Sequence, residues 1–289
     1  MIDTAVVTYK NQNEKIGELR ETIILDKYSK EKKDENIVVY KPSREINRGT
    51  SLIPTIKTVE RIEALEKKYE LKDGVLTRFD YAVDFEGDLN ADIKKYRLFL
   101  ECLNKSRGWS RQGGKVFLTN REEYIIGNIK IGNTYRKTTI YNAEDKERVL
   151  NIRFEDRTEI RTEEQNKRKT ITDKLENLYD ELAGIENYIE VVEAEKVRKL
   201  VNRYKTHQGD YVSFSEFISN QEENSYILTK NILVGAYKKI GMKGNPNNFI
   251  KRFRSTRPSK LEFVTKGEMK EMADKIRRII KIELKELEG

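Results

Sequence analysis

Acidic and aromatic side chains alternate over residues 76–89 of this 289-residue chain. In an extended strand, successive side chains point to opposite faces, so Asp80 and Asp84 would share one face. The opposite face would be apolar, with Phe79, Tyr81, Val83 and Phe85. Two carboxylates on one face of a central strand need neutralising, and a hard divalent cation such as Mg²⁺ or Mn²⁺ does this well. The alternative is an exposed edge strand whose polar face is solvated.

A second candidate strand over residues 151–160 could supply a further oxygen ligand. Its Glu155 and Glu159 share a face with Arg153 and Arg157. Such alternation is also typical of a ladder of cross-strand charge pairs, which the spacing alone favours. The sequence therefore leaves open whether either glutamate binds a metal.

Between these two strands, residues 132–142 carry candidate nucleophiles. Tyr135, Lys137, Thr139 and Tyr141 would share a face of a strand. A tyrosine, whose ordinary pKa is about 10, can act as a covalent nucleophile if cations or a metal stabilise its phenolate. Lys137 and a nearby arginine, Arg136 or Arg153, are the candidate cations. Among fifteen tyrosines, position alone favours a structural role for any one of them.

Composition limits the chemistry further. The chain has 57 Lys+Arg against 49 Asp+Glu, a net charge of +8, which favours a polyanionic partner such as nucleic acid. The single histidine, His207, excludes a paired-histidine metal site, so metal ligands would be mainly carboxylates. The single cysteine, Cys102, excludes an intrachain disulfide. With a mean hydropathy of -0.78 and no leader pattern, we expect a cytoplasmic protein that does not enter the membrane.

Hydrophobic periodicity predicts an α+β fold, with an antiparallel sheet covered by helices on one face. The predicted helices of this part span residues 56–69 and 92–103. The predicted strands span residues 21–28, 36–40, 75–85, 116–119, 124–131, 135–141 and 149–155.

A charged helical segment follows over residues 163–207, with an apolar heptad seam from Ile171 to Val192 that Gly184 interrupts. The seam predicts either one or two helices packed on the chain's own sheet or a coiled coil that forms a homodimer. We place a catalytic domain at residues 1–205 and a smaller, mainly helical, basic region at 206–289. Helices are predicted there at 226–240 and 267–287.

Cations and aromatic residues interleave in this C-terminal region, over residues 248–257. Its cations are candidates for phosphate contacts with duplex DNA. They are Lys251, Arg252, Arg254 and Arg257. The alternative is a helix whose aromatic side chains are core and whose cations are only solvated.

Two motifs resemble those of the Rep-trans, or replication initiation factor, family, which includes the initiators of staphylococcal-type rolling-circle plasmids. Thr77-Arg-Phe-Asp-Tyr-Ala-Val-Asp-Phe-Glu-Gly-Asp-Leu89 resembles that family's Thr-Arg-Leu-Asp-x-Ala-x-Asp-Phe-Glu-x-Asp-Leu strand. Ile140-Tyr141-Asn142 is similar to its Arg-Ile-Tyr-Asn-Lys segment, although Thr139 and Ala143 replace the flanking cations. The resemblance covers roughly residues 36–160.

The resemblance implies a nickase that joins its tyrosine, here Tyr141, to the 5′ phosphate at a replication origin. Tyr135 is the alternative nucleophile. The metal, Mg²⁺ or Mn²⁺, would be held by Asp80, Asp84 and Glu155, with Glu159 as the alternative to Glu155. A host helicase would be a partner. Other interpretations are a relaxase of an integrative element, a non-catalytic DNA-binding regulator with the same fold, and a basic scaffold protein.

Overall fold

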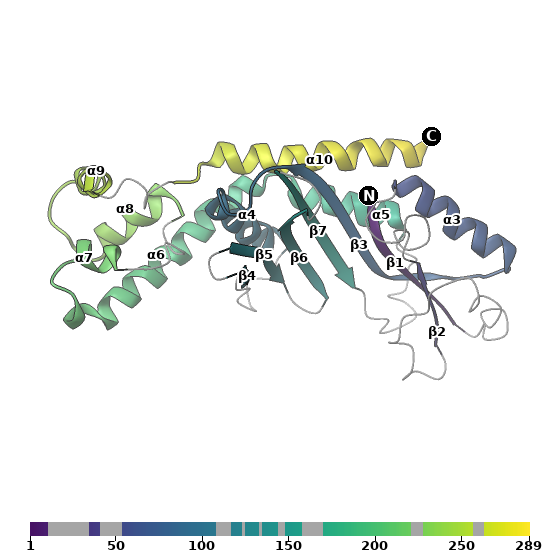
Figure 1. Ribbon diagram of the computed structural model, residues 1–289, viewed down its shortest axis with the longest axis horizontal. Coiled ribbons are helices and arrows are strands. Elements are labelled where there is room, and N and C mark those ends of the chain that lie inside the picture. Colours follow the sequence, from purple (N-terminus) through teal and green to yellow (C-terminus); the bar gives the residue numbers. More distant parts are fainter. Residues whose placement is uncertain are drawn as a thin grey trace. The chain divides into compact units, whose positions relative to one another are not determined.

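The structure is a computed structural model that describes residues 1–10, 35–40, 54–107, 117–122, 125–132, 135–143, 148–157, 170–220, 228–256 and 263–289 (Figure 1). It confirms the α+β class. Seven antiparallel strands form one sheet in the order β2-β1-β3-β7-β6-β5-β4. They are β1 (Ile2–Lys10), β2 (Glu35–Tyr40), β3 (Val75–Glu86), β4 (Phe117–Glu122), β5 (Ile125–Gly132), β6 (Arg136–Asn142) and β7 (Val149–Arg157).

Six of these strands were predicted from the sequence, and β1 was not. The strand predicted at residues 21–28 lies outside the described residues. β1 pairs with β2 on one side and with β3 on the other, and two register irregularities interrupt its pairing with β3. Its Ala5, Val7 and Tyr9 are at most 7% exposed. The first strand of the chain is therefore a central strand of the sheet.

Helices cover the face of the sheet that carries Tyr81. α3 (Thr55–Lys68) is tied to β1 by the Tyr9 hydroxyl, which donates to Glu66 Oε1 at 3.1 Å. α5 (Ile171–Leu182) is tied to β7 by an ion pair of 2.8 Å between Lys174 and Asp156. The C-terminal part of α10 (Lys266–Glu288) joins α3, because the Thr55 hydroxyl donates to Glu283. The predicted covering of one sheet face by helices is thus observed.

A single apolar core fills the space between these helices and the sheet. Its members alternate along the strands, as the sequence predicted for β3, and all are at most 7% exposed. They include Phe79, Tyr81 and Val83 from β3, Leu150, Ile152 and Phe154 from β7, Ile140 from β6, and Leu175, Leu178 and Leu182 from α5. Burial of this face leaves the opposite face of β3, β7 and β6 to carry the polar side chains.

The chain divides into two compact units. Unit 1 comprises Met1–Asn90, Gly114–Ala183 and Lys275–Gly289, and unit 2 comprises Ala91–Gly113 and Gly184–Asp274. The chain passes from unit 1 to unit 2 between Ala183 and Gly184. Gly184 adopts a φ of +67°, which suits glycine, and it separates α5 from the helix that follows. The boundary that we placed near residue 205 lies inside unit 2, at the end of α6 (Ile189–Thr206).

Unit 2 is helical. It holds α4 (Ile93–Ser106), the 3-10 helices η3 (Ile185–Tyr188) and η4 (Gln208–Asp210), α6, α7 (Phe214–Ser219), α8 (Lys230–Lys239) and α9 (Pro246–Thr256). Ion pairs of 2.5 and 2.6 Å, Lys105–Glu195 and Lys196–Glu101, join α4 to α6. Glu193 of α6 accepts from the Thr229 hydroxyl at 2.6 Å and so positions the start of α8.

The heptad seam belongs to two helices rather than one. Ile171, Leu175, Leu178 and Leu182 lie on α5, whereas Ile185, Ile189 and Val192 follow Gly184 on η3 and α6. All seven are at most 7% exposed within a single chain. The seam is therefore buried within the chain, as the first interpretation held, but only its α5 part lies against the sheet, whereas η3 and α6 pack against α4.

Candidate functional site

The strand register gathers most of the predicted site residues on the face of the sheet opposite the helices. We call this surface the polar face. Three rows cross it from β3 through β7 to β6. The rows are Asp80–Glu155–Lys137, Ala82–Arg153–Thr139 and Asp84–Asn151–Tyr141. Neighbouring rows are two residues, or about 7 Å, apart along the strands.

The first row is a network of neutralised carboxylates. Asp80 is fully buried and accepts from Arg78 Nε at 2.9 Å. Lys137 Nζ lies 2.7 Å from Glu155 Oε1, and Arg78 reaches the other oxygen of Glu155 at 4.0 Å. Burial raises the pKa of Asp80 above its ordinary value, although Arg78 opposes the shift. Arg78 and Lys137 thus neutralise Asp80 and Glu155, which face one another across β3 and β7.

The third row holds the candidate nucleophile. Arg153 Nη2 lies 3.5 Å from the Tyr141 hydroxyl and 3.0 Å from Asp3 Oδ1. Asn151 Nδ2 donates to Asp84 Oδ1 at 2.8 Å. Burial raises the pKa of Tyr141 above 10, and Arg153 counteracts part of this rise. Tyr141 is therefore a protonated phenol at neutral pH and must lose its proton in order to attack.

Three buried polar atoms of the polar face have no hydrogen-bond partner among the described residues. They are Thr139 Oγ1, Asn151 Oδ1 and Arg153 Nε. An unpaired buried polar atom is costly, and the three residues occupy neighbouring positions around Tyr141. The guanidinium N–H and the threonine hydroxyl are donors that suit phosphate oxygens. This arrangement provides unfilled hydrogen-bonding capacity next to the candidate nucleophile.

The three carboxylates expected to hold a metal do not lie together. Asp80 and Glu155 face one another across β3 and β7. Asp84 is four residues, or about 13 Å, further along β3. Among the residues that the structure describes, no group of three or more His, Cys, Asp and Glu side chains could hold a metal ion. Glu159, the alternative ligand, lies outside the described residues.

The two candidate tyrosines lie at opposite ends of the polar face. Tyr135 directly precedes β6 and is 38% exposed, and its carbonyl oxygen accepts from Arg157 N at 2.6 Å. It is six residues, or about 20 Å, from Tyr141 along the strand direction. Tyr135 is therefore one row from the Asp80–Glu155 pair, whereas Tyr141 is two rows from it and adjacent to Arg153.

The candidate DNA-binding cations are distributed over several surfaces. Lys137 and Arg153 lie on the polar face, but Arg136 turns to the helix-covered face, where it pairs with Asp156 and Glu181. Lys251 and Arg252 are exposed on α9. Arg257 and the side chain of Arg254 lie outside the described residues. Of the expected phosphate-binding cations, Lys137 and Arg153 therefore lie on the polar face.

Sequence reasoning missed three residues of this site. Arg78 stands two residues before Asp80 on β3, so the period-two pattern could have indicated it. Asn151 occupies the row of Tyr141 on a strand that was predicted. Asp3 could not be placed without β1, which was not predicted. Each of the three binds a residue that the sequence did single out: Asp80, Asp84 and Arg153.

Comparison with protein-family models, with curated protein sequences and with solved structures gives no match. Within the described part of the chain, no helix is both long enough and apolar enough to cross a membrane.

Proposed function

We propose that this protein nicks one strand of DNA through Tyr141 and so initiates rolling-circle replication. The observation that carries the proposal is the position of Tyr141 beside Arg153, on a face with unfilled donors. The two motifs shared with rolling-circle initiators support the choice of DNA as substrate. The net charge of +8 is compatible with it.

In the proposed reaction, the Tyr141 oxygen attacks a backbone phosphorus while its proton is lost. The bond from phosphorus to the 3′ oxygen breaks, and the 3′ oxygen takes up a proton to become a hydroxyl. Arg153 holds a nonbridging oxygen, where the negative charge grows. The products are a 5′-phosphotyrosine and a 3′ hydroxyl. Because one phosphodiester replaces another, religation by the reverse reaction needs no ATP.

A divalent cation belongs to the proposal through the resemblance. Asp80 and Glu155 are the two expected ligands that lie together, but Arg78 and Lys137 neutralise them, and Asp84 is bound by Asn151. The observed arrangement does not fit a three-carboxylate site. Nicking in EDTA, compared with nicking in Mg²⁺ or Mn²⁺, decides whether this chain depends on a metal ion.

The function is tested by incubating the protein with supercoiled DNA that carries the region flanking its gene. We expect nicked circles and a covalent adduct that survives denaturing gels. The Tyr141→Phe variant should form neither product, while Tyr135→Phe should retain both. Equal activity of the wild type and Tyr141→Phe would rule out Tyr141 as the nucleophile. Absence of any nicking on supercoiled or single-stranded DNA would rule out the nickase.

A second candidate is a DNA-binding regulator that retains this fold without catalysis. The paired carboxylates and the raised pKa of Tyr141 favour it. Specific, metal-independent DNA binding without cleavage would support it. A relaxase of an integrative element would use the same chemistry, and conjugation genes beside the gene would identify it. A host helicase is the proposed partner of the initiator only.

A further inference from the structure

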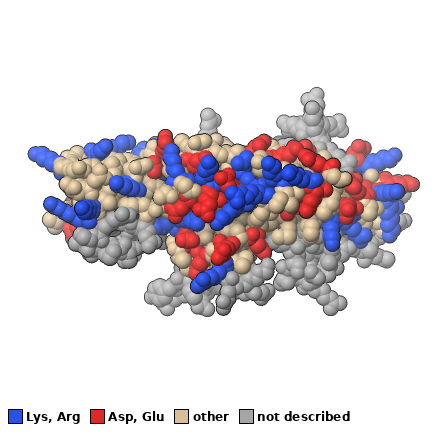
Figure 2. Space-filling view, turned by 90° about the horizontal axis from the view of Figure 1, so that it is seen from above, with Lys and Arg blue, Asp and Glu red and all other residues tan. Residues whose placement is uncertain are grey.

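The positive charge of the chain is concentrated in one segment of unit 2. Residues 224–261 contain nine Lys and Arg and no Asp or Glu. The remainder of the chain holds 48 Lys+Arg against 49 Asp+Glu and is therefore almost neutral. At the left end of Figure 2, where α8 and α9 lie, blue side chains lie among tan ones with little red. Such a one-signed surface attracts a polyanion.

Two helices of this segment are joined by a glycine-containing turn of six residues, 240–245. α8 ends at Lys239 and α9 begins at Pro246. Gly241 and Gly244 adopt φ values of +79° and +104°, which glycine tolerates best. The Tyr237 hydroxyl donates to the carbonyl oxygen of Lys243 at 2.7 Å and fixes the turn. Figure 1 shows α9 end-on, whereas α8 runs across the view.

The first turn of α9 is also fixed. Asn245 Oδ1 accepts from the backbone N–H of Asn247 at 2.8 Å, and proline occupies the first helical position. Both features are typical of a stable helix start. The order of a helix, a glycine-containing connection and a second helix is that of a helix-turn-helix, although the connection here has six residues instead of three or four.

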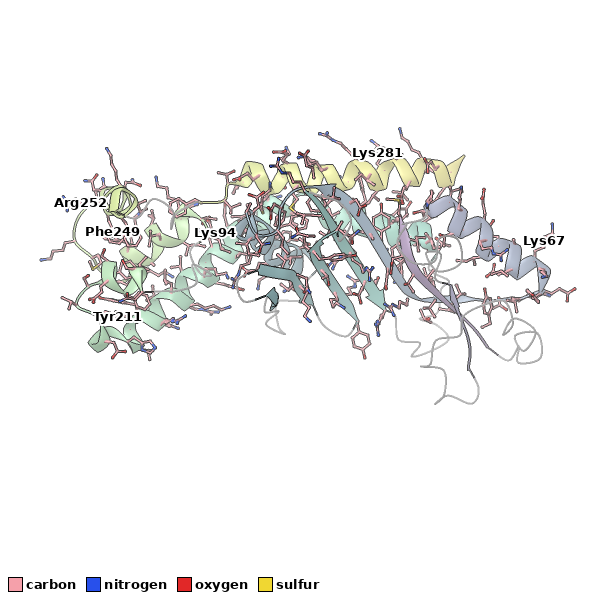
Figure 3. All side chains as sticks on the ribbon, viewed as in Figure 1. Lys67, Lys94, Tyr211, Phe249, Arg252 and Lys281 are labelled. Carbon is pink, nitrogen blue, oxygen red and sulfur yellow. The ribbon has the colours of Figure 1, made fainter. Side chains whose placement is uncertain are left out.

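Packing determines which side of α9 faces outward. The Phe249 ring lies 5.8 Å from the ring of Phe214 on α7 and 5.0 Å from that of Tyr237 on α8. Ile250 and Phe253 are at most 5% exposed. Figure 3 shows Phe249 on the side of α9 toward α7 and α8, and Arg252 on the outer side. The exposed residues of the outer side are Asn247, Asn248, Lys251 and Arg252.

We propose that α9 enters the major groove of duplex DNA and that Asn248 and Lys251 read base edges there. Asparagine can bind adenine with two hydrogen bonds, and lysine can donate to guanine O6 and N7. The exposed Lys238, Lys239 and Lys243, at the end of α8 and in the turn, contact the phosphates. This inference rests on the proposed function only in taking DNA as the partner of the chain.

The test is a selection from a random-sequence duplex pool by the full-length protein. We expect the wild type to enrich one short motif. Asn248→Ala and Lys251→Ala should each lose preference at one or two positions of that motif, with affinity for it lowered roughly 5- to 150-fold. The matched controls are Asn202→Ala on α6 and Lys67→Ala on α3, both exposed helical positions, and they should enrich the motif unchanged. Circular dichroism checks that every variant is folded.

Phosphate contacts are distinguished from base contacts by salt dependence. Lys239→Ala should weaken binding to all duplex sequences and reduce the slope of log affinity against log salt by about one. Asn248→Ala should leave that slope unchanged, because it removes no charge. Equal loss of affinity for all sequences in Asn248→Ala would contradict a base contact.

The nicking proposal and this inference fail in different ways. Asn248→Ala should nick a single-stranded oligonucleotide at the wild-type rate, and Tyr141→Phe should enrich the wild-type motif. If the wild type nicks DNA but enriches no duplex motif, or if Asn248→Ala and Lys251→Ala enrich the same motif with unchanged affinity, α9 is not the reading helix. Preference of the same surface for single-stranded RNA over duplex DNA would also overturn the inference.

Discussion

Arg153 Nη2 lies 3.5 Å from the Tyr141 hydroxyl and, on its other side, 3.0 Å from Asp3 Oδ1. The phenol, the cation beside it and the acid that anchors the cation come from β6, β7 and β1. The position of Arg153 therefore depends on the pairing of β1 with β3, more than seventy residues along the chain. The candidate nucleophile is positioned by the sheet as a whole rather than by a local loop.

Arg153→Gln should slow formation of the covalent adduct by roughly 10²- to 10³-fold, the range for loss of one donor to a developing oxyanion. Single-turnover nicking of an oligonucleotide measures this rate. The control Arg198→Gln removes the same charge from an exposed position on α6 and should leave the rate unchanged. Equal rates for Arg153→Gln and the wild type would show that Arg153 does not bind the reacting phosphate.

Tyr141 should make folding sensitive to alkaline pH. Burial raises the pKa of its folded-state phenol above 10. The unfolded state therefore ionises first, and the contribution of Tyr141 to stability is full below pH 10 and falls as the pH rises further. Between pH 9 and about 11, urea titrations should show a steeper loss of unfolding free energy for the wild type than for Tyr141→Phe. Tyr135→Phe is the control at an exposed position. If the unfolding free energy of the wild type and of Tyr141→Phe falls equally steeply with pH, the raised pKa of Tyr141 is contradicted.

Arg78→Ala should destabilise the fold by about 3–5 kcal/mol at pH 7, because it leaves the buried Asp80 carboxylate without its cation. Adding Asp80→Asn should recover part of this loss. The raised pKa of Asp80 makes the defect smaller near pH 4, where the carboxyl group of the variant binds a proton. Urea unfolding of the two variants at both pH values measures these effects. A defect independent of pH would assign it to lost packing by Arg78.

The alternation within β3 was predictable because side-chain direction in a strand depends only on local geometry. It correctly separated Phe79 and Tyr81 from Asp80 and Asp84. The same alternation places Arg78 on the face of Asp80, but it does not show whether this arginine or a metal neutralises the buried carboxylate, since the pattern is the same in both cases. The contact between Arg153 and Asp3 depends on strand order and on the irregular register of β1, which long-range pairing sets.

In the wild type, Lys137 neutralises Glu155. If Asp80 and Glu155 can bind Mn²⁺, Lys137→Met should therefore increase the affinity of the protein for this ion. Glu155→Gln should decrease that affinity. Titration of free Mn²⁺ by electron paramagnetic resonance gives both values without depending on nicking. Lys281→Met on α10 is the control for removal of one exposed positive charge. Failure of the wild type and of Lys137→Met to bind Mn²⁺ at millimolar concentration would exclude a metal at this pair.

Gly241→Ala should test whether the turn before α9 positions the reading helix. Its φ of +79° costs an L-residue about 1–2 kcal/mol, and since a Cβ there would meet no atom within 4 Å, the penalty comes from the backbone alone. Gly209→Ala is a matched control, because its added Cβ also meets nothing within 4 Å but its φ is not positive. We expect Gly241→Ala to lower the unfolding free energy by that amount and to weaken binding to the selected duplex motif. Gly209→Ala should change neither quantity. Loss of stability with unchanged duplex binding would contradict the positioning of α9 by this turn.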